Sequence, residues 1–315
     1  MHDPARGPLV WLDMDQAALD AAYDQARHAP NRAQVTGRYA SDSARVRERL
    51  GEPDRFAYGP APIETLDVYR TPRADGVADA GAGAPINVFI HGGAWRNGRA
   101  SSYAFMAELF VAAGAHLVVP DFSWVQDTGG DLMPIARQVQ RAIAWVYRNA
   151  RSFGGDPDRI HVSAHSSGAH LAAVALTTDW PAAFGLPAGV LKGGLLCSGI
   201  YDLAPVRLSA RSSYVAFTDE SEQALSPMRH IQRIDAPLVL ACGTLESPEF
   251  VRQSQAFAAA LRAAGKPVAL QVAQHCNHFE VLETLANPCG LLGRAVLAQM
   301  GLTLDPERGP RLRAR

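Results

Sequence analysis

The segment Arg159–Leu171 constrains the fold more than any other part of the chain. It begins as a β-prone run, passes through a turn of small residues, and continues into a stretch rich in alanine and leucine. The turn reads Ala-His-Ser-Ser-Gly at 164–168, which fits the pattern G-x-S-x-G with alanine in place of the first glycine. Such a turn is sharp and crowded, and it lifts one serine hydroxyl clear of the sheet at the start of a helix. The register makes Ser166 the candidate nucleophile and Ser167 the residue after it.

A second β-prone run ends in a glycine-rich loop, His-Gly-Gly-Ala-Trp at 91–95. Glycines let the backbone approach a substrate closely and turn its N–H groups toward a developing negative charge. With a serine turn downstream, we expect the N–H groups of Gly92, Gly93 and Ser167 to form an oxyanion hole. His91 is expected to brace the loop and not to act as a base.

An acid and a histidine follow the serine, in the chain order that serine hydrolases with this turn use. Residues 237–243 are predicted to form a buried strand, and Glu246 lies just beyond it. Residues 267–272 are predicted to form the next strand, and His278 follows. Both side chains therefore come after the C-terminal ends of strands, where open α/β sheets place their chemistry. Glu246 is the first candidate acid, and Asp202, after an earlier strand, is the alternative.

Helix-like and strand-like segments alternate along the chain, which predicts a mostly parallel central sheet with helices on both faces. The predicted helices are 14–28, 45–50, 103–113, 131–151, 249–264 and 278–300, and the further predicted strands are 116–119 and 193–197. Residues 71–85 are rich in Pro, Gly, Ala and Asp and are expected to form an exposed hairpin loop.

We expect one domain at 1–305, followed by a flexible tail at 306–315. Within the domain, residues from 1 to about 60 are expected to form a helical cap over the pocket. Residues 204–229 show no clear periodicity and are expected to form a lid or a wall of the pocket.

The composition excludes several other classes of protein. The chain has 315 residues, 48% of them hydrophobic, and a net charge of −1, so it can bury a large core and has no basic excess for nucleic acid. No window approaches the ~18 apolar residues of a membrane span, and the N-terminus has no apolar secretory region. These features favour a soluble cytoplasmic protein that acts on a small molecule.

The four cysteines form neither a C-x-x-C pair nor a disulfide framework, so reduced thiols are expected. His275, Cys276 and His278 could be interpreted as a metal cluster. They lack a second group of ligands at zinc-like spacing, and a triad needs His278 free. We therefore expect no metal and no cofactor.

The chain resembles the kynurenine formamidases (arylformamidases) of the α/β-hydrolase fold, which are close to hormone-sensitive-lipase-like esterases. The matching segments are 91–95, 164–170, 243–250 and 278–280, and the resemblance runs from about residue 20 to about residue 300. Ser247–Phe250 is the most family-specific piece. Two departures stand out: the family usually has aspartate where this chain has Glu246, and alanine where it has Ser167. A glutamate can still fix the tautomer of a catalytic histidine.

The resemblance implies a serine hydrolase that converts N-formyl-kynurenine to kynurenine and formate through Ser166, His278 and Glu246. Trp95 and Tyr201 are expected to contact the substrate, although Trp95 could instead pack the loop down. One alternative is a carboxylesterase of broader range acting on short-chain aryl esters. Another, a ligand-binding protein without turnover, is disfavoured because every triad position is chemically competent. The sequence leaves the oligomeric state open, with a homodimer as one option.

Overall fold

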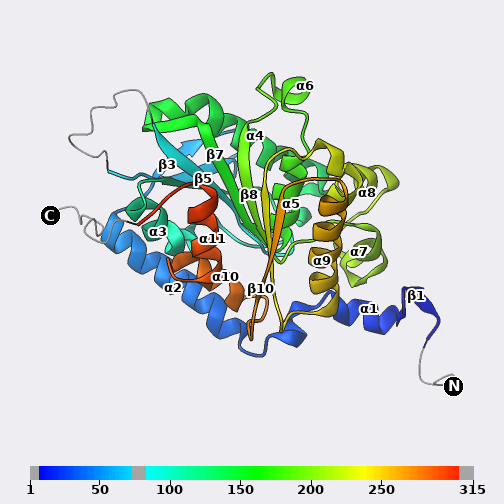
Figure 1. Ribbon diagram of the computed structural model, residues 1–315. Helices are drawn as coiled ribbons and strands as arrows, with labels where there is room; N and C mark the ends of the chain where they lie inside the picture. Colours follow the sequence, from blue (N-terminus) through cyan, green and yellow to red (C-terminus); the bar gives the residue numbers. More distant parts are fainter. Residues whose placement is uncertain (1–6, 73–82, 305–315) are drawn as a thin grey trace.

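The computed structural model describes residues 7–72 and 83–304 of the chain (Figure 1). The predicted tail at 306–315 lies outside the described residues, as does most of the segment 71–85. Within the described ranges, no helix is both long enough and apolar enough to cross a bilayer.

An eight-stranded sheet forms the centre of the molecule, with the order β10-β9-β8-β7-β5-β6-β4-β3 (Figure 1). The strands from β10 to β6 in that order are parallel, whereas β4 is antiparallel to both β6 and β3. Their bounds are β3 Asp54–Ala57, β4 Thr65–Tyr69, β5 Ala84–Ile90, β6 His116–Pro120, β7 Gly155–His165, β8 Leu191–Cys197, β9 Leu238–Gly243 and β10 Val268–Ala273. The mostly parallel sheet agrees with the expectation from the sequence.

The hairpin expected around 71–85 is wrong, because the strands on either side of that segment do not pair with each other. β4 and β5 flank that segment in sequence, but β6 lies between them in the sheet and pairs with both. The side chains of β6 are buried along its whole length, so it gains more apolar contact between two strands than it would at an edge.

Helices cover both faces of the sheet, and the core divides accordingly into two apolar clusters. One cluster packs α4, α5 and α9 on the face that carries Val88 and Val162, and the other packs α2, α3 and α11 on the face that carries Phe89 and Leu195. The helices are α1 Gln16–Ala22, α2 Arg32–Leu50, α3 Ala107–Ala112, α4 Met133–Asn149, α5 Ser167–Leu176, α6 Trp180–Phe184, α7 Ala204–Leu208, α8 Asp219–Ala224, α9 Pro248–Ala263, α10 Glu280–Glu283 and α11 Leu291–Gln299. Two short strands, β1 Leu9–Trp11 and β2 Met14–Asp15, pair at the N-terminal end.

Short 3₁₀ helices join several of these elements. They are η1 Gln25–His28, η2 Ala100–Ser102, η3 Ala104–Met106, η4 Val125–Thr128, η5 Ala150–Phe153, η6 Ala210–Ser213, η7 Pro227–Arg233 and η8 Thr284–Ala286.

Four predicted helices differ from the structure in their lengths, and the one expected at 103–113 is divided into η3 and α3. The helix expected at 45–50 is the end of the 19-residue helix α2, whose buried residues Val35, Tyr39, Ser43 and Val46 follow helical spacing but include a polar serine, which weakens the apolar pattern. The helix expected at 14–28 ends at Ala22, after the Asp15 carboxylate caps its start by accepting from the Ala18 N–H. The helix expected at 278–300 is divided into α10, η8 and α11.

Candidate active site

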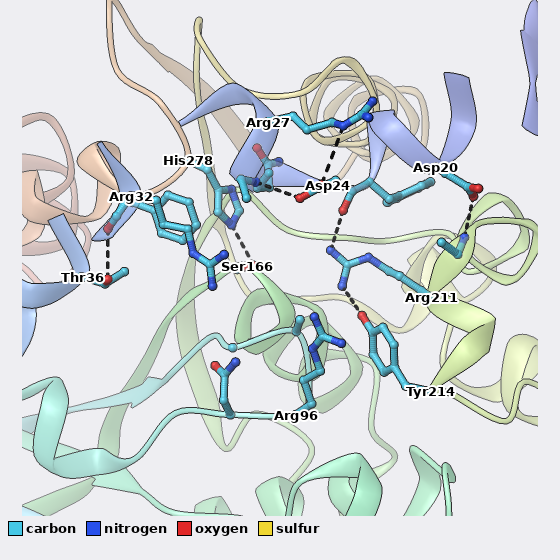
Figure 2. Close-up of a pocket in the computed structure, with 18 of the residues that line it drawn as sticks. Asp20, Asp24, Arg27, Arg32, Thr36, Arg96, Ser166, Arg211, Tyr214 and His278 are labelled. Atoms are coloured by element: carbon cyan, nitrogen blue, oxygen red, sulfur yellow. Dashed lines mark hydrogen bonds and ion pairs between the residues drawn. The ribbon is translucent and has the colours of Figure 1, made fainter. Parts of the chain in front are cut away.

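Ser166 occupies a strained turn between β7 and α5. Its backbone has φ 58° and ψ −127°, and its N–H donates to the Cys197 carbonyl over 2.9 Å. The turn packs so tightly that a Cβ atom on Gly168 would lie 2.2 Å from the Ile90 carbonyl oxygen. Only glycine fits there, which explains the last glycine of the motif. The Ser166 side chain lies in a cavity of about 680 Å³ that His278 also lines (Figure 2).

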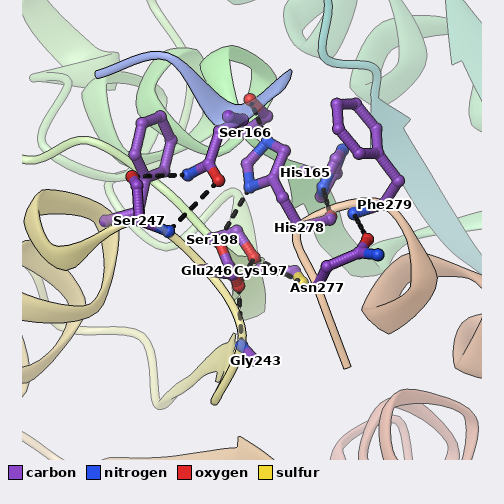
Figure 3. Close-up of polar contacts among 12 residues, drawn as sticks. His165, Ser166, Cys197, Ser198, Gly243, Glu246, Ser247, Asn277, His278 and Phe279 are labelled. Carbon is purple, nitrogen blue, oxygen red and sulfur yellow. Dashed lines mark hydrogen bonds and ion pairs between the residues drawn. The ribbon is translucent and has the colours of Figure 1, made fainter. Parts of the chain in front are cut away.

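The three residues predicted as a triad form a continuous hydrogen-bonded array (Figure 3). Ser166 Oγ lies 2.9 Å from His278 Nε2, and His278 Nδ1 lies 2.7 Å from Glu246 Oε2. A carboxylate can only accept, so His278 carries its proton on Nδ1 and leaves Nε2 free to accept from the Ser166 hydroxyl. All three side chains are buried.

The second carboxylate oxygen of Glu246 is held by two donors. Its Oε1 accepts from the Ser198 hydroxyl and from the Gly243 N–H, each over 2.6 Å. Ser198 was not predicted from the sequence, although its place directly after β8 puts it at the same edge of the sheet. The alternative acid, Asp202, accepts instead from the Ala204 N–H, so Glu246 is the acid that the structure brings to His278.

The glycine loop is fixed in place by its first residue. The His91 ring is stacked between the Tyr103 and Phe122 rings, with centroids 5.3 and 4.3 Å away, and its Nδ1 donates to the Gly92 carbonyl. Complete burial lowers the pKa of His91 to about 4, so the ring is neutral at neutral pH. The structure therefore places His91 as a brace, as expected.

Gly92 and Gly93 hold the loop against the serine turn. A Cβ atom on Gly92 would lie 2.9 Å from the His165 carbonyl oxygen, and Gly93 has φ 129°, a conformation that favours glycine. The Trp95 N–H donates to Ser167 Oγ over 3.2 Å, which ties the loop to the first turn of α5. Ser167 is also the first residue of α5, where backbone N–H groups have no partner within the helix.

His165, the residue before Ser166, supports the hydrogen-bonded array. Its Nε2 donates to the backbone carbonyl of His278 over 2.8 Å, and the two ring centroids are 4.6 Å apart. Burial, and secondly the nearby His278, hold the pKa of His165 well below its usual range. His165 therefore fixes the backbone of His278 without adding a second charge.

The two residues predicted to contact the substrate do not lie among the residues that line the cavity. Trp95 is buried, and its indole N–H donates to His170 Nδ1 over 3.2 Å. Tyr201 is fully buried and stacks on Phe257 with centroids 4.3 Å apart. These predictions are corrected: both aromatic rings pack inward, and Trp95 holds the loop down.

The cavity is walled by segments far apart in sequence. The N-terminal elements α1, η1 and the start of α2 line it, and so do residues of η6, which lies within 204–229. Its volume lies in the range of small-molecule sites. Its charged lining residues are Asp20, Asp24, Arg27, Arg32, Arg96 and Arg211 (Figure 2). Within the described ranges, no group of three or more His, Cys, Asp or Glu side chains is placed to hold a metal ion.

The sheet, its two helical layers and the serine turn at the C-terminal edge define the chain as an α/β-hydrolase. The structure of esterase Est2 from Thermogutta terrifontis, with propionate bound, is similar, with a TM-score of 0.65 and 21% identity over 80% of this chain and 96% of that one. The model of the BD-FAE family matches residues 66–184.

Two proteins named kynurenine formamidase are similar over most of their length. The one from Danio rerio is 29% identical over 303 residues, which cover 92% of this chain and 98% of the relative. The one from Salmo salar is 30% identical over 250 residues, which cover 78% and 80%. The chain belongs to the kynurenine formamidase family, and it is a hydrolase.

Proposed function

We propose that this hydrolase removes the formyl group from an N-formyl aryl amide, N-formyl-kynurenine, and releases kynurenine and formate. The observation that carries the proposal is the hydrogen-bonded array of Ser166, His278 and Glu246, which opens into the cavity of a chain from this family. The buried Glu246 carboxylate fixes the His278 tautomer that can accept the proton of Ser166.

In the first half of the reaction, His278 Nε2 takes the proton of the Ser166 hydroxyl while Oγ attacks the formyl carbon. The carbonyl oxygen becomes an oxyanion, which the N–H groups of Gly92, Gly93 and Ser167 stabilise, each contributing about 3 kcal/mol to the transition state. The C–N bond then breaks as His278 returns the proton to the leaving arylamine. Ser166 is left as a formyl ester.

In the second half, water gives a proton to His278 Nε2 and attacks the formyl ester. The same N–H groups hold the second oxyanion, and the ester bond breaks as His278 returns the proton to Ser166 Oγ. Glu246 stays ionised throughout and stabilises the imidazolium that forms twice in the cycle. Formic acid leaves and ionises in water to formate and a proton, and the enzyme returns to its starting state.

A broader-range carboxylesterase is the second candidate. The same array cleaves activated aryl esters, and a cavity of about 680 Å³ has room for leaving groups of several shapes. The two candidates differ in the acyl group that they accept, because a formyl-sized site excludes longer chains by overlap.

A direct comparison of rates separates the candidates. The kcat/KM values of the purified protein are measured on N-formyl-kynurenine and on formyl, acetyl and butyryl aryl esters, with and without a chelator. We expect hydrolysis of N-formyl-kynurenine that a chelator does not change, and poor hydrolysis of the butyryl ester. If butyryl or longer esters are the best substrates and N-formyl-kynurenine is untouched, the enzyme is the esterase.

A further inference from the structure

Three arginines at the cavity form no ion pair with a carboxylate of the residues that the structure describes. Arg32, Arg96 and Arg211 all line it, and Figure 2 shows their guanidinium groups gathered around Ser166. Among the described residues, none of the three forms an ion pair with an aspartate or a glutamate. Arg32 and Arg96 are exposed and Arg211 is half-buried, so an anion that enters the cavity meets positive charges that no carboxylate of the described residues pairs.

Arg211 is the most firmly held of the three. It is half-buried, and its Nη1 donates to the Tyr214 hydroxyl over 2.9 Å while its Nη2 donates to the Tyr23 carbonyl over 3.0 Å. Its guanidinium carbon also lies 5.6 Å from the centre of the Trp95 ring. These neutral contacts fix the group without neutralising it, so it keeps its charge for a ligand. Its Nε is buried and has no partner among the described residues.

Arg96 extends the same positive site from the other side of Tyr214. Its guanidinium carbon lies 4.5 Å from the centre of the Tyr214 ring, whose hydroxyl accepts from Arg211. Arg96 directly follows Trp95 at the end of the glycine loop and lines the same cavity as Gly93. We call Arg96 and Arg211 the arginine pair. Through Tyr214, which both contact, the pair connects the loop after β5 to η6.

The two acidic residues of the cavity form no ion pair with Arg32, Arg96 or Arg211 among the described residues. Asp20 accepts from the Ala210 N–H over 2.6 Å and from the Gln16 side chain. Asp24 accepts from the Ala26 N–H and lies 3.9 Å from Arg27. Four arginines and two aspartates line the cavity, so its lining keeps a positive balance.

We infer that the arginine pair binds a carboxylate carried by the leaving group, so that this enzyme selects substrates with that carboxylate over substrates that lack it. The planar fork of an arginine matches a carboxylate in two hydrogen bonds. The inference rests on the proposed function, since the amino-acid part of N-formyl-kynurenine carries such a carboxylate. It also predicts that aryl esters with a carboxylate on the leaving group are preferred, which the proposed function does not.

Two matched pairs of substrates test the inference. The first pair is N-formyl-kynurenine and N-formyl-kynuramine, which lacks only the carboxylate. The second pair is 3-acetoxybenzoate and phenyl acetate. For each pair, the ratio of kcat/KM for the substrate with the carboxylate to kcat/KM for the substrate without it is measured. Wild-type enzyme should favour the member with the carboxylate in both pairs, and kynurenine should inhibit hydrolysis of phenyl acetate more strongly than kynuramine does.

Variants then assign the preference to the arginine pair. Arg211→Gln and Arg96→Gln should each lower the ratio roughly 10-fold to 100-fold, the range for hydrogen bonds to a charged group. Arg211→Lys should restore part of the ratio, since it keeps the charge and loses the fork. Arg45→Gln is the control for net charge, because Arg45 is exposed on α2, pairs with Asp42 and does not line the cavity. Its ratio should equal that of the wild type.

The outcomes separate this inference from the proposed function. A ratio near one in the wild type, or a ratio that neither glutamine variant changes, overturns the carboxylate site. An equal loss on both members of a pair also overturns it, because that result indicates a structural role alone. If neither formyl amide is hydrolysed but the ester ratio depends on Arg211 and Arg96, the formamidase proposal fails and the carboxylate site stands.

Discussion

Replacing Glu246 by glutamine exchanges one carboxylate oxygen for an NH₂ group, and the structure determines which one. The Gly243 N–H and the Ser198 hydroxyl both donate to Oε1. The amide oxygen must therefore take the Oε1 position, because an NH₂ group there would face the fixed donor of Gly243. The NH₂ group then faces His278 Nδ1 and donates to it. The imidazole proton moves to Nε2, which can no longer accept the proton of Ser166.

The expected loss follows from this exchange of tautomers. Where an aspartate of a serine protease is replaced by its amide, turnover falls by about 10⁴-fold with the geometry intact. We expect a loss of the same order for Glu246→Gln, which keeps the size and the contacts of the side chain. Glu246→Asp keeps the charge but is one methylene shorter, and a misplacement of about 1 Å can cost about 100-fold. It should fall between the wild type and the glutamine variant.

The assay is steady-state hydrolysis of N-formyl-kynurenine and phenyl acetate, with thermal unfolding to confirm that each variant is folded. Asp202→Asn is the matched control, because Asp202 accepts from the Ala204 N–H and does not contact His278. It should keep activity close to that of the wild type. The reasoning is refuted if folded Glu246→Gln loses less than about tenfold, or if Asp202→Asn loses as much.

Three further predictions follow from the contacts of the site. Ser167→Ala removes the acceptor of the Trp95 N–H and should lower kcat about tenfold, the cost of an unpaired buried donor, whereas a kcat equal to that of the wild type would show that the loop needs no such tie. Burial lowers the pKa of both His91 and His170 to about 4, so at pH 5 the unfolded chain binds protons there that the folded chain does not. These two groups should lower the free energy of unfolding by about 2 kcal/mol each between pH 7 and pH 5. Urea titrations at both pH values measure the free energy of unfolding. In His170→Gln, the fall that the two histidines cause between pH 7 and pH 5 should be about half as large, and a fall equal to that of the wild type would contradict the lowered pKa of His170. Each methylene beyond the formyl group that cannot be fitted should cost about 1–3 kcal/mol in kcat/KM, measured over formyl, acetyl and butyryl aryl esters; equal rates would rule out a formyl-sized site.

The sequence predicts those parts of the site that depend on local motifs and on the order of residues along the chain. Ser166, Glu246 and His278 each follow a strand that the sequence reveals by its apolar run, and parallel strands bring their C-terminal ends to one edge. The alternation of strands and helices likewise predicts the parallel sheet. The order of the strands is not local, which is why β6 could not be placed between β4 and β5.

The residues that the sequence does not predict act through neighbours distant in the chain. Ser198 reaches Glu246 only because β8 lies beside β9, and Arg211 enters the cavity only because η6 folds back against the N-terminal cap. Trp95 has a positive φ of 60°, and its ring packs inward against His170, which a motif of residue types does not reveal. The Trp95 ring also lies near Arg211, whose guanidinium carbon is 5.6 Å from the ring centre.

Covalent labelling by an organophosphate tests most directly the central claim, that His278 activates Ser166 as the nucleophile. The protein is treated with paraoxon, its intact mass is measured, and the modified residue is located by peptide sequencing. We predict one label per chain, on Ser166, with activity lost in proportion to labelling, and the same label on Ser166 in Ser167→Ala. Ser166→Ala should take no label and should lose at least ~10³-fold in turnover. A label on another residue, or full hydrolytic activity in Ser166→Ala, would contradict the account.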